Sequence, residues 1–266
     1  MLSDNLLLDL EQKGIVHVKN FFDSNELEKA RKIVKNYSVK KGHDLSYFST
    51  NLKLLIYKVL KLNFKRLSED IFFLRLAKKK KIDKFSDKHF KKKSFLKFID
   101  AYYSEVSDQD VLPWHTDQAY EGVEKNEKGF VNPDNYHIKF FIYLTDVGPE
   151  NGCMSYIPYS HKLGYIIRKG IYNNEIKFDK YFLLKEFRNF CKKNKDYLIK
   201  QLNDKKVFDK FIEETEFIES NKDTKKFDYS LRAGDAIIFN EGGVHKGSKS
   251  TISERMVLRY LYSSKT

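Results

Sequence analysis

Two short segments far apart in the chain carry side chains that could bind one metal ion. His115 and Asp117 stand two residues apart in the run Pro113-Trp114-His115-Thr116-Asp117, and residues with this spacing point to the same side of a strand. His245 follows the glycine-rich bend Glu241-Gly242-Gly243-Val244. Two histidines and one carboxylate on one face leave three iron positions open, which is the facial triad of iron(II) oxygenases. We therefore expect His115, Asp117 and His245 to be both the metal ligands and the catalytic centre.

A third segment could bind a carboxylate. Arg255, Val257 and Arg259 belong to a strand-like run and should share one of its faces. A planar guanidinium suits the capture of a carboxylate by two parallel hydrogen bonds. Arg255, ten residues beyond His245, is the favoured contact for the far carboxylate of 2-oxoglutarate, with Arg259 as the alternative.

Short strands and helices surround these segments. The opening predicts a helix that ends at Gly14, a strand at Ile15–Val18 and a helix capped by Asp23 and Glu26. Apolar, β-branched and aromatic runs predict later strands joined by turns, which is typical of a sandwich or barrel. The expected fold is mainly β with flanking helices (α+β), a double-stranded β-helix or cupin-like jelly roll, in a single domain over 1–266. The predicted helix is 51–76, and the predicted later strands are 95–103, 137–144, 236–239 and 257–262.

One stretch does not fit the strand pattern. Residues 171–230 are rich in charges of both signs and place Phe182, Leu183, Phe187 and Phe190 at helical spacing. We expect a largely helical insertion between two strands, and insertions of this length are often lids over a site.

Composition narrows the class of protein. The chain has 266 residues, of which 41% are hydrophobic, enough for one good core. It has no apolar run long enough to span a bilayer and no signal-peptide pattern at its start. Cys153 and Cys191 form no spaced framework, so we expect free thiols, a cytoplasmic location and no membrane partner.

The formal charge of +13 invites a nucleic-acid interpretation. Much of it lies in 75–97, where Arg75 and ten lysines face only Asp83 and Asp87. An anionic partner could dock there, but no nucleic-acid motif accompanies the charge. We therefore interpret the stretch as a solvated surface and expect a small-molecule substrate and no nucleic acid.

The ordered motifs resemble those of the phytanoyl-CoA dioxygenase (PhyH-like) family. The run from Trp114 to Gln118 is similar to the family's metal motif, and Asn151–His161 resembles its "NGC…IPGSH" turn, with Tyr159 where a glycine is usual. The segment from Gly234 to His245, followed by Arg255, resembles the family's distal half. The matching pieces are scattered over residues 10–262 and leave 171–230 unmatched.

The resemblance implies an Fe(II)- and 2-oxoglutarate-dependent dioxygenase. Such an enzyme consumes O2, releases succinate and CO2, and hydroxylates or otherwise oxidises a small metabolite or biosynthetic intermediate. Arg255 would anchor the cosubstrate. Thr116 and Tyr103 (or its neighbour Tyr102) could contact it, and so could Lys139 if its strand face points inward.

Three other interpretations compete with this one. A jelly-roll metalloprotein that does not use 2-oxoglutarate would have no need of Arg255. A non-catalytic binding protein would have no need of all three ligands. A nucleic-acid demethylase is suggested by the charge alone. The presence of Asp117 also predicts oxidation rather than halogenation, because related halogenating enzymes lack this ligand and bind the halide in its place.

Overall fold

The computed structural model describes residues 2–41, 45–50, 56, 59–61, 64–117, 119, 132–221 and 223–264. The described strands form a six-stranded sheet and a four-stranded sheet, with antiparallel pairing between neighbours. The larger sheet consists, in spatial order, of β1 (Ile15–Val18), β8 (Ala236–Asn240), β5 (His137–Tyr143), β10 (Arg255–Ser263), β3 (Phe95–Ser104) and β2 (Leu45–Phe48). The smaller sheet consists of β4 (Leu112–His115), β9 (His245–Gly247), β6 (Met154–Tyr156) and β7 (Asp228–Tyr229).

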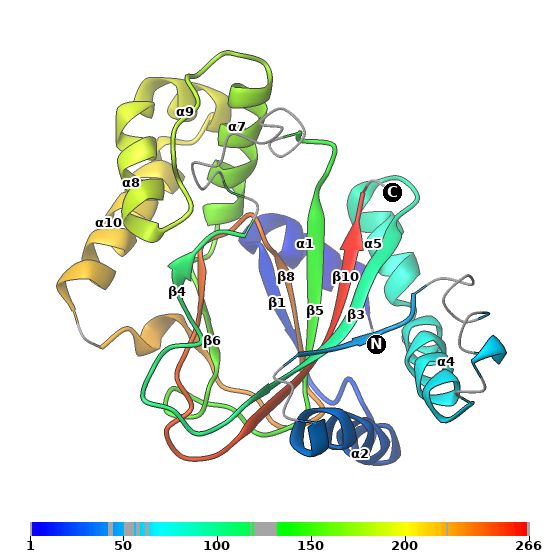
Figure 1. Ribbon diagram of the computed structural model, residues 1–266. Coiled ribbons are helices and arrows are strands. Elements are labelled where there is room, and N and C mark those ends of the chain that lie inside the picture. The colour runs from blue at the N-terminus through cyan, green and yellow to red at the C-terminus, as the bar shows by residue number, and fades with distance from the viewer. Residues whose placement is uncertain are drawn as a thin grey trace.

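The two sheets enclose an inner core, and this is the predicted double-stranded β-helix (Figure 1). Tyr143, Phe239 and Val257 from the large sheet pack with Met154 and Tyr156 from the small one. Because neighbouring side chains of a strand point to opposite faces, the large sheet also has an outer face.

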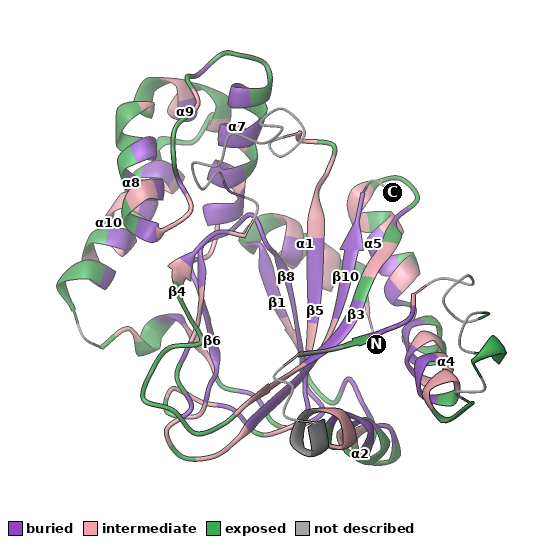
Figure 2. Cartoon of the chain, viewed as in Figure 1, coloured by how far each residue is buried: buried purple, intermediate pink, exposed green. Residues whose placement is uncertain are grey.

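Helices cover that outer face (Figure 1). They are α1 (Asp4–Lys13), α2 (Ser24–Lys41), α4 (Phe64–Lys79) and α5 (Ile82–Phe90). Strand β5 shows the division: Ile138, Phe140 and Ile142 pack toward the helices, while Lys139 and Phe141 line a pocket on the inner face. Burial is correspondingly continuous through the central strands (Figure 2).

Local chemistry sets the helix boundaries near the N-terminus. Gly14 ends α1 with a φ of 82°, in the left-handed region that glycine adopts without strain. The amide of Glu26 donates to the Asp23 carboxylate and the amide of Asp23 donates to Glu26, each at 2.9 Å. This reciprocal pair is the capping box that the sequence predicted.

Helical residues between β6 and β7 form a separate cluster at the upper left of Figure 1. They are α7 (Ser160–Tyr172), α8 (Leu184–Lys193), α9 (Lys195–Leu202) and α10 (Lys205–Ser220), followed by a short 3-10 turn, η1 (Lys225–Phe227). The helical part thus begins at Ser160, before the predicted 171–230. Its start was missed because the motif ending at His161 was interpreted only as a turn.

Most of the strand predictions are confirmed within two residues, whereas the predicted helix over 51–76 is only partly tested. Residues 51–55 lie outside the described part of the chain, and α4 begins at Phe64. No helix in the described ranges combines the length and apolar character needed to cross a bilayer.

Candidate metal centre

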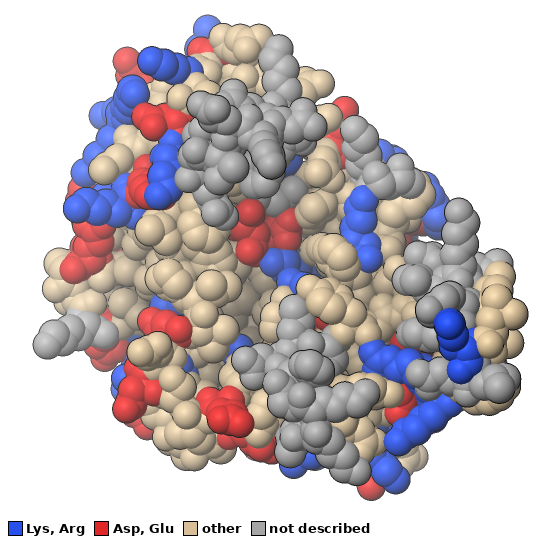
Figure 3. All heavy atoms as spheres, viewed as in Figure 1, with Lys and Arg blue, Asp and Glu red and all other residues tan. Residues whose placement is uncertain are grey.

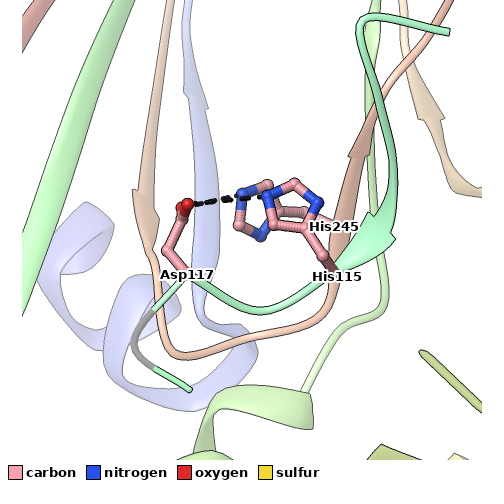
Figure 4. A group of neighbouring side chains, drawn as sticks. All are labelled: His115, Asp117 and His245. Atoms are coloured by element: carbon pink, nitrogen blue, oxygen red, sulfur yellow. Dashed lines mark ion pairs between the residues drawn. The ribbon is translucent and has the colours of Figure 1, made fainter. Parts of the chain in front are cut away.

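Strands β4 and β9 bring the three predicted ligands together. They pair so that His115 lies directly opposite His245, and Asp117 follows two residues after His115 in a turn. The ligand atoms of the three side chains all lie within 4.8 Å of one another and point toward one another (Figure 4). His245 Nε2 is 3.0 Å from Asp117 Oδ2, and His115 Nε2 is 3.5 Å from Asp117 Oδ1.

Backbone carbonyl groups fix how the two imidazole rings are presented. His115 Nδ1–H donates to the Pro113 carbonyl at 2.7 Å, and His245 Nδ1–H donates to the Gly243 carbonyl at 2.9 Å. These bonds place the proton on Nδ1 and leave the Nε2 lone pair for a metal. His115 Nε2 is buried and has no hydrogen-bond partner among the described residues. The donor set therefore fits a metal ion.

The electrostatics of the centre favour the metal-binding protonation states. Burial lowers the pKa of His245, so its ring is held neutral although Asp117 opposes the shift. Burial alone would raise the pKa of Asp117, but the charge of Lys139 holds it well below its usual range. A neutral imidazole and an ionised carboxylate are the forms that bind metal.

A buried ion-pair network extends from Asp117. Lys139 Nζ lies 2.5 Å from Asp117 Oδ2 and 3.2 Å from Glu241 Oε2. The other Glu241 oxygen bonds with His137. Burial would lower the pKa of Lys139, yet the two carboxylates hold it above its ordinary value. The sequence did not indicate a role for Glu241, because its partner Lys139 lies on a strand that is far away in the sequence.

A pocket with a cavity volume of about 100 Å³ opens beside the side chains of His115, Asp117 and His245. The space-filling view shows charged atoms of both signs together near the centre of this face (Figure 3). The walls of the pocket combine apolar side chains with four lysine and arginine side chains. The lining residues are Tyr102, Val111, Leu112, His115, Asp117, Lys139, Phe141, Tyr143, Met154, His245, Lys246, Gly247, Arg255, Val257 and Arg259.

The two arginines that face this pocket differ in their partners. Arg259 donates through Nε to Asp100 Oδ1 at 2.7 Å and through Nη2 to the other oxygen, so its charge is matched. Arg255 is buried and donates only to neutral groups, the Gly152 carbonyl and the Ser104 hydroxyl. Its Nε has no partner among the described residues. Within the described residues, Arg255 is thus the arginine of this pair that lacks a carboxylate partner.

Of the other residues predicted to contact the cosubstrate, some line the pocket and some do not. Tyr102 lines the pocket, but Tyr103 lies on the opposite face of β3 and donates to Glu254 at 2.8 Å. Thr116 is buried behind the ligands, where its amide donates to the Phe182 carbonyl at 3.0 Å and its hydroxyl to the Glu241 carbonyl at 3.4 Å. Gln118 lies outside the described residues.

The helical insertion reaches the metal centre through the segment before α8. Leu183 forms an isolated bridge with His115. The Phe182 ring lies 5.4 Å from the His115 ring, measured between centroids. The sequence placed Phe182 within the insertion, but only the structure brings it to the ligand.

The basic stretch at 75–97 lies away from this centre. It belongs mainly to α4 and α5, which cover the outer face of the large sheet, and basic atoms gather over α4 at the right of Figure 3. Several of its lysines are in ion pairs: Lys79 and Lys80 with Glu26, and Lys88 with Asp4.

Comparisons with known proteins agree with this geometry. The family model described as phytanoyl-CoA dioxygenase (PhyH) matches residues 10–257. HygX from Streptomyces hygroscopicus, solved with nickel and 2-oxoglutarate bound, is similar with a TM-score of 0.59, at 16% identity over 99% of this chain and 87% of that chain. AviO1 from Streptomyces viridochromogenes Tue57 is similar with a TM-score of 0.53, at 12% identity over 98% of this chain and 94% of that chain.

A third solved structure is SnoK, a non-heme alpha ketoglutarate dependent carbocyclase from nogalamycin biosynthesis. Its TM-score is 0.56, at 17% identity over 98% of this chain and 84% of that chain. At such low sequence identities, the structural similarity shows that the fold is shared and nothing further. No curated protein sequence matches the chain.

Proposed function

The chain belongs to the phytanoyl-CoA dioxygenase family of iron- and 2-oxoglutarate-dependent enzymes, and on this premise we propose that His115, Asp117 and His245 bind Fe(II). The family match confirms the resemblance that the motifs predicted. The bound iron would supply the oxygen chemistry, in which 2-oxoglutarate is split to succinate and CO2 while the substrate is oxidised. The protein's own groups hold the reactants in place and exclude water.

Arg255 carries the cosubstrate part of this proposal. It is a buried cation that has no carboxylate partner in the described part of the chain, and it lines the same pocket as the three proposed ligands. Burying an unpaired charge is costly, and the carboxylate of 2-oxoglutarate that lies far from the metal would supply the missing partner. A metalloprotein that did not use such an acid would gain nothing from this arrangement. Tyr102 replaces Tyr103 as the proposed tyrosine contact, because it lines the pocket.

The charges of the pocket favour an uncharged reacting group on the substrate. Among the cations that line it, Lys139 pairs with Asp117, Arg259 with Asp100 and Lys246 with Asp110 at 3.8 Å. Arg255 is thus the lining cation without an acidic partner in the described part of the chain, and 2-oxoglutarate would take it. One HygX structure holds hygromycin B with nickel and 2-oxoglutarate, and we propose a small biosynthetic intermediate as substrate here.

We also propose that the insertion forms one wall of the substrate pocket. The contacts of Phe182 and Leu183 with His115 support this. Phe182→Ala should raise KM for the substrate or uncouple succinate formation from product formation. Phe217→Ala, which truncates a half-buried phenylalanine of α10, is the matched control and should do neither. Equal behaviour of the two variants would contradict the proposal.

The test of the activity is succinate formation by protein loaded anaerobically with Fe(II) and then exposed to O2 and 2-oxoglutarate. Uncharged metabolites and matched carboxylated or phosphorylated analogues would be compared for substrate-dependent succinate. We expect stimulation by uncharged compounds. Absence of succinate under all conditions, with iron bound, would contradict the proposed function.

Cys153 and Cys191 are both buried free thiols, which supports the proposal that the protein works in the cytoplasm.

A further inference from the structure

Two carboxylates, the half-buried Asp117 and the buried Glu241, lie on either side of one lysine beside the metal centre. Lys139 Nζ contacts Asp117 Oδ2 at 2.5 Å and Glu241 Oε2 at 3.2 Å. Lys139 is 6% exposed and Glu241 is 4% exposed, so water screens these charges weakly. The positive charge of Lys139 would repel a metal ion bound nearby. A lysine at this position therefore needs an explanation.

The reason lies in how close Glu241 comes to the ligand. The Asp117 amide donates to the Glu241 carbonyl at 3.1 Å, which ties the two chain segments together. The shared contact with Lys139 places the Glu241 carboxylate near that of Asp117, and carboxylates bind Fe(II) readily. If that carboxylate joined the three ligands, it would fill a position that 2-oxoglutarate or O2 needs. A working site must hold it away.

Lys139 is placed to do this while also orienting Asp117. Its contact with Glu241 Oε2 retains the second carboxylate, and His137 holds the other oxygen of that group. Its contact with Asp117 Oδ2, which also lies 3.0 Å from His245 Nε2, fixes the orientation of this carboxylate, whose Oδ1 faces His115 Nε2 at 3.5 Å. One lysine thus orients both carboxylates.

We propose that Lys139 is a positioning residue that fixes the orientation of Asp117 and keeps Glu241 out of the coordination sphere. The inference rests on the proposed function, since it concerns the same metal centre. Its consequence is that removing the lysine should weaken 2-oxoglutarate binding through Glu241. Removing Glu241 as well should reverse that loss.

The experiment uses the full chain loaded with Co(II), whose visible spectrum reports the number and geometry of its ligands. 2-Oxoglutarate is titrated into wild type, Lys139→Met, Glu241→Gln and the double variant Lys139→Met/Glu241→Gln. Arg188→Met is the matched control. Arg188 is also a buried cation paired with a glutamate, Glu219, but it lies in the helical insertion and does not line the pocket. Circular dichroism melting checks the folding of each variant.

We expect Lys139→Met to change the Co(II) spectrum and to raise the Kd for 2-oxoglutarate. Loss of an outer partner of a metal ligand typically lowers metal affinity or activity about 10- to 100-fold, and we expect a change of that order in this Kd. The double variant should recover most of the lost affinity for 2-oxoglutarate. Arg188→Met should melt at a lower temperature with an unchanged spectrum and Kd. Lys139→Arg, which keeps the charge, should lie nearer wild type than Lys139→Met.

Two results would overturn the inference. In the first, Lys139→Met retains the wild-type spectrum and Kd. In the second, the double variant binds 2-oxoglutarate as weakly as Lys139→Met, which would show that Glu241 does not cause the loss of affinity. Failure of the wild-type protein itself to bind Co(II) would instead contradict the proposed function, so the two failures are distinguishable.

Discussion

Replacing Arg255 by methionine should separate cosubstrate binding from folding stability. In the folded protein, Arg255 is a buried cation that donates to the Gly152 carbonyl and the Ser104 hydroxyl and has no acidic partner in the described ranges. The Met variant loses two hydrogen bonds to neutral groups but also loses an unpaired buried charge. These effects oppose each other, so the metal-loaded protein without 2-oxoglutarate should melt close to wild type.

The effect on 2-oxoglutarate should be large. Removing one partner of a buried charge pair costs about 2–5 kcal/mol, which raises Kd about 30- to 4,000-fold. At 100 times its Kd a ligand stabilises the folded state by about 2.7 kcal/mol. For a chain of this size that corresponds to an increase in Tm of about 5–10 °C. If Kd rises about 100-fold, the same 2-oxoglutarate concentration should raise the Tm of Arg255→Met by only about 1 °C.

Arg259→Met is the matched control for this experiment. It breaks the buried pair with Asp100, which is fully buried, and should destabilise the protein by about 3–5 kcal/mol. Arg259→Met/Asp100→Asn should recover part of that stability. The assay is thermal unfolding with Ni(II) in place of iron, with and without 2-oxoglutarate. Wild-type stabilisation of Arg255→Met by 2-oxoglutarate, or loss of it in Arg259→Met alone, would refute the assignment of Arg255.

Three further predictions follow from the site and the core. His245→Ala should lower Ni(II) affinity by more than the about 10- to 100-fold that loss of an outer partner costs, and calorimetry showing wild-type affinity would contradict the ligand assignment. With 18O2 and chloride present, mass spectrometry of an oxygenated product should show 18O and no chlorine, because Asp117, as the proposed ligand, would occupy the position that a halide would need; a chlorinated product would be the contrary result. Burial lowers the pKa of His161 to about 4, so between about pH 6.5 and 4 the unfolded chain takes up a proton that the folded one refuses, and the metal-free protein should lose stability by up to about 1.4 kcal/mol per pH unit. In His161→Gln, urea unfolding should show that part of the slope removed, and an unchanged slope would exclude this histidine as its source.

The sequence predicted the jelly roll, and it named the three side chains that the structure brings together, because each strand run and each motif can be recognised locally. Strand runs, the capping box at Asp23 and the H-x-D spacing are each readable within a few residues. The local geometry nevertheless differs from the expected one: His115 ends β4, and Asp117 lies in the turn after it rather than in the strand. The bond from the Asp117 amide to the Glu241 carbonyl shapes that turn.

Features that depend on long-range pairing were out of reach. The sequence offered Tyr102 and Tyr103 for one position, and only the phase of β3 against β10 decides which faces inward, since a shift of one residue reverses the face. The Asp100 partner of Arg259 and the contact of Phe182 with His115 likewise join distant segments. Charge and spacing alone could not connect them.

The direct opposition of His115 and His245 on β4 and β9 has a consequence for how the chain holds together. A metal bound by both histidines would act as a cross-link between strands far apart in sequence, much as a disulfide closes a long loop. Strand β4 is four residues long, lies at the edge of its sheet and has an irregular register between Leu112 and His115. Chelation should therefore open this edge first, and amide hydrogen exchange should rise around β4 before the six-stranded sheet is affected. Such local opening would expose metal-free protein selectively to proteases.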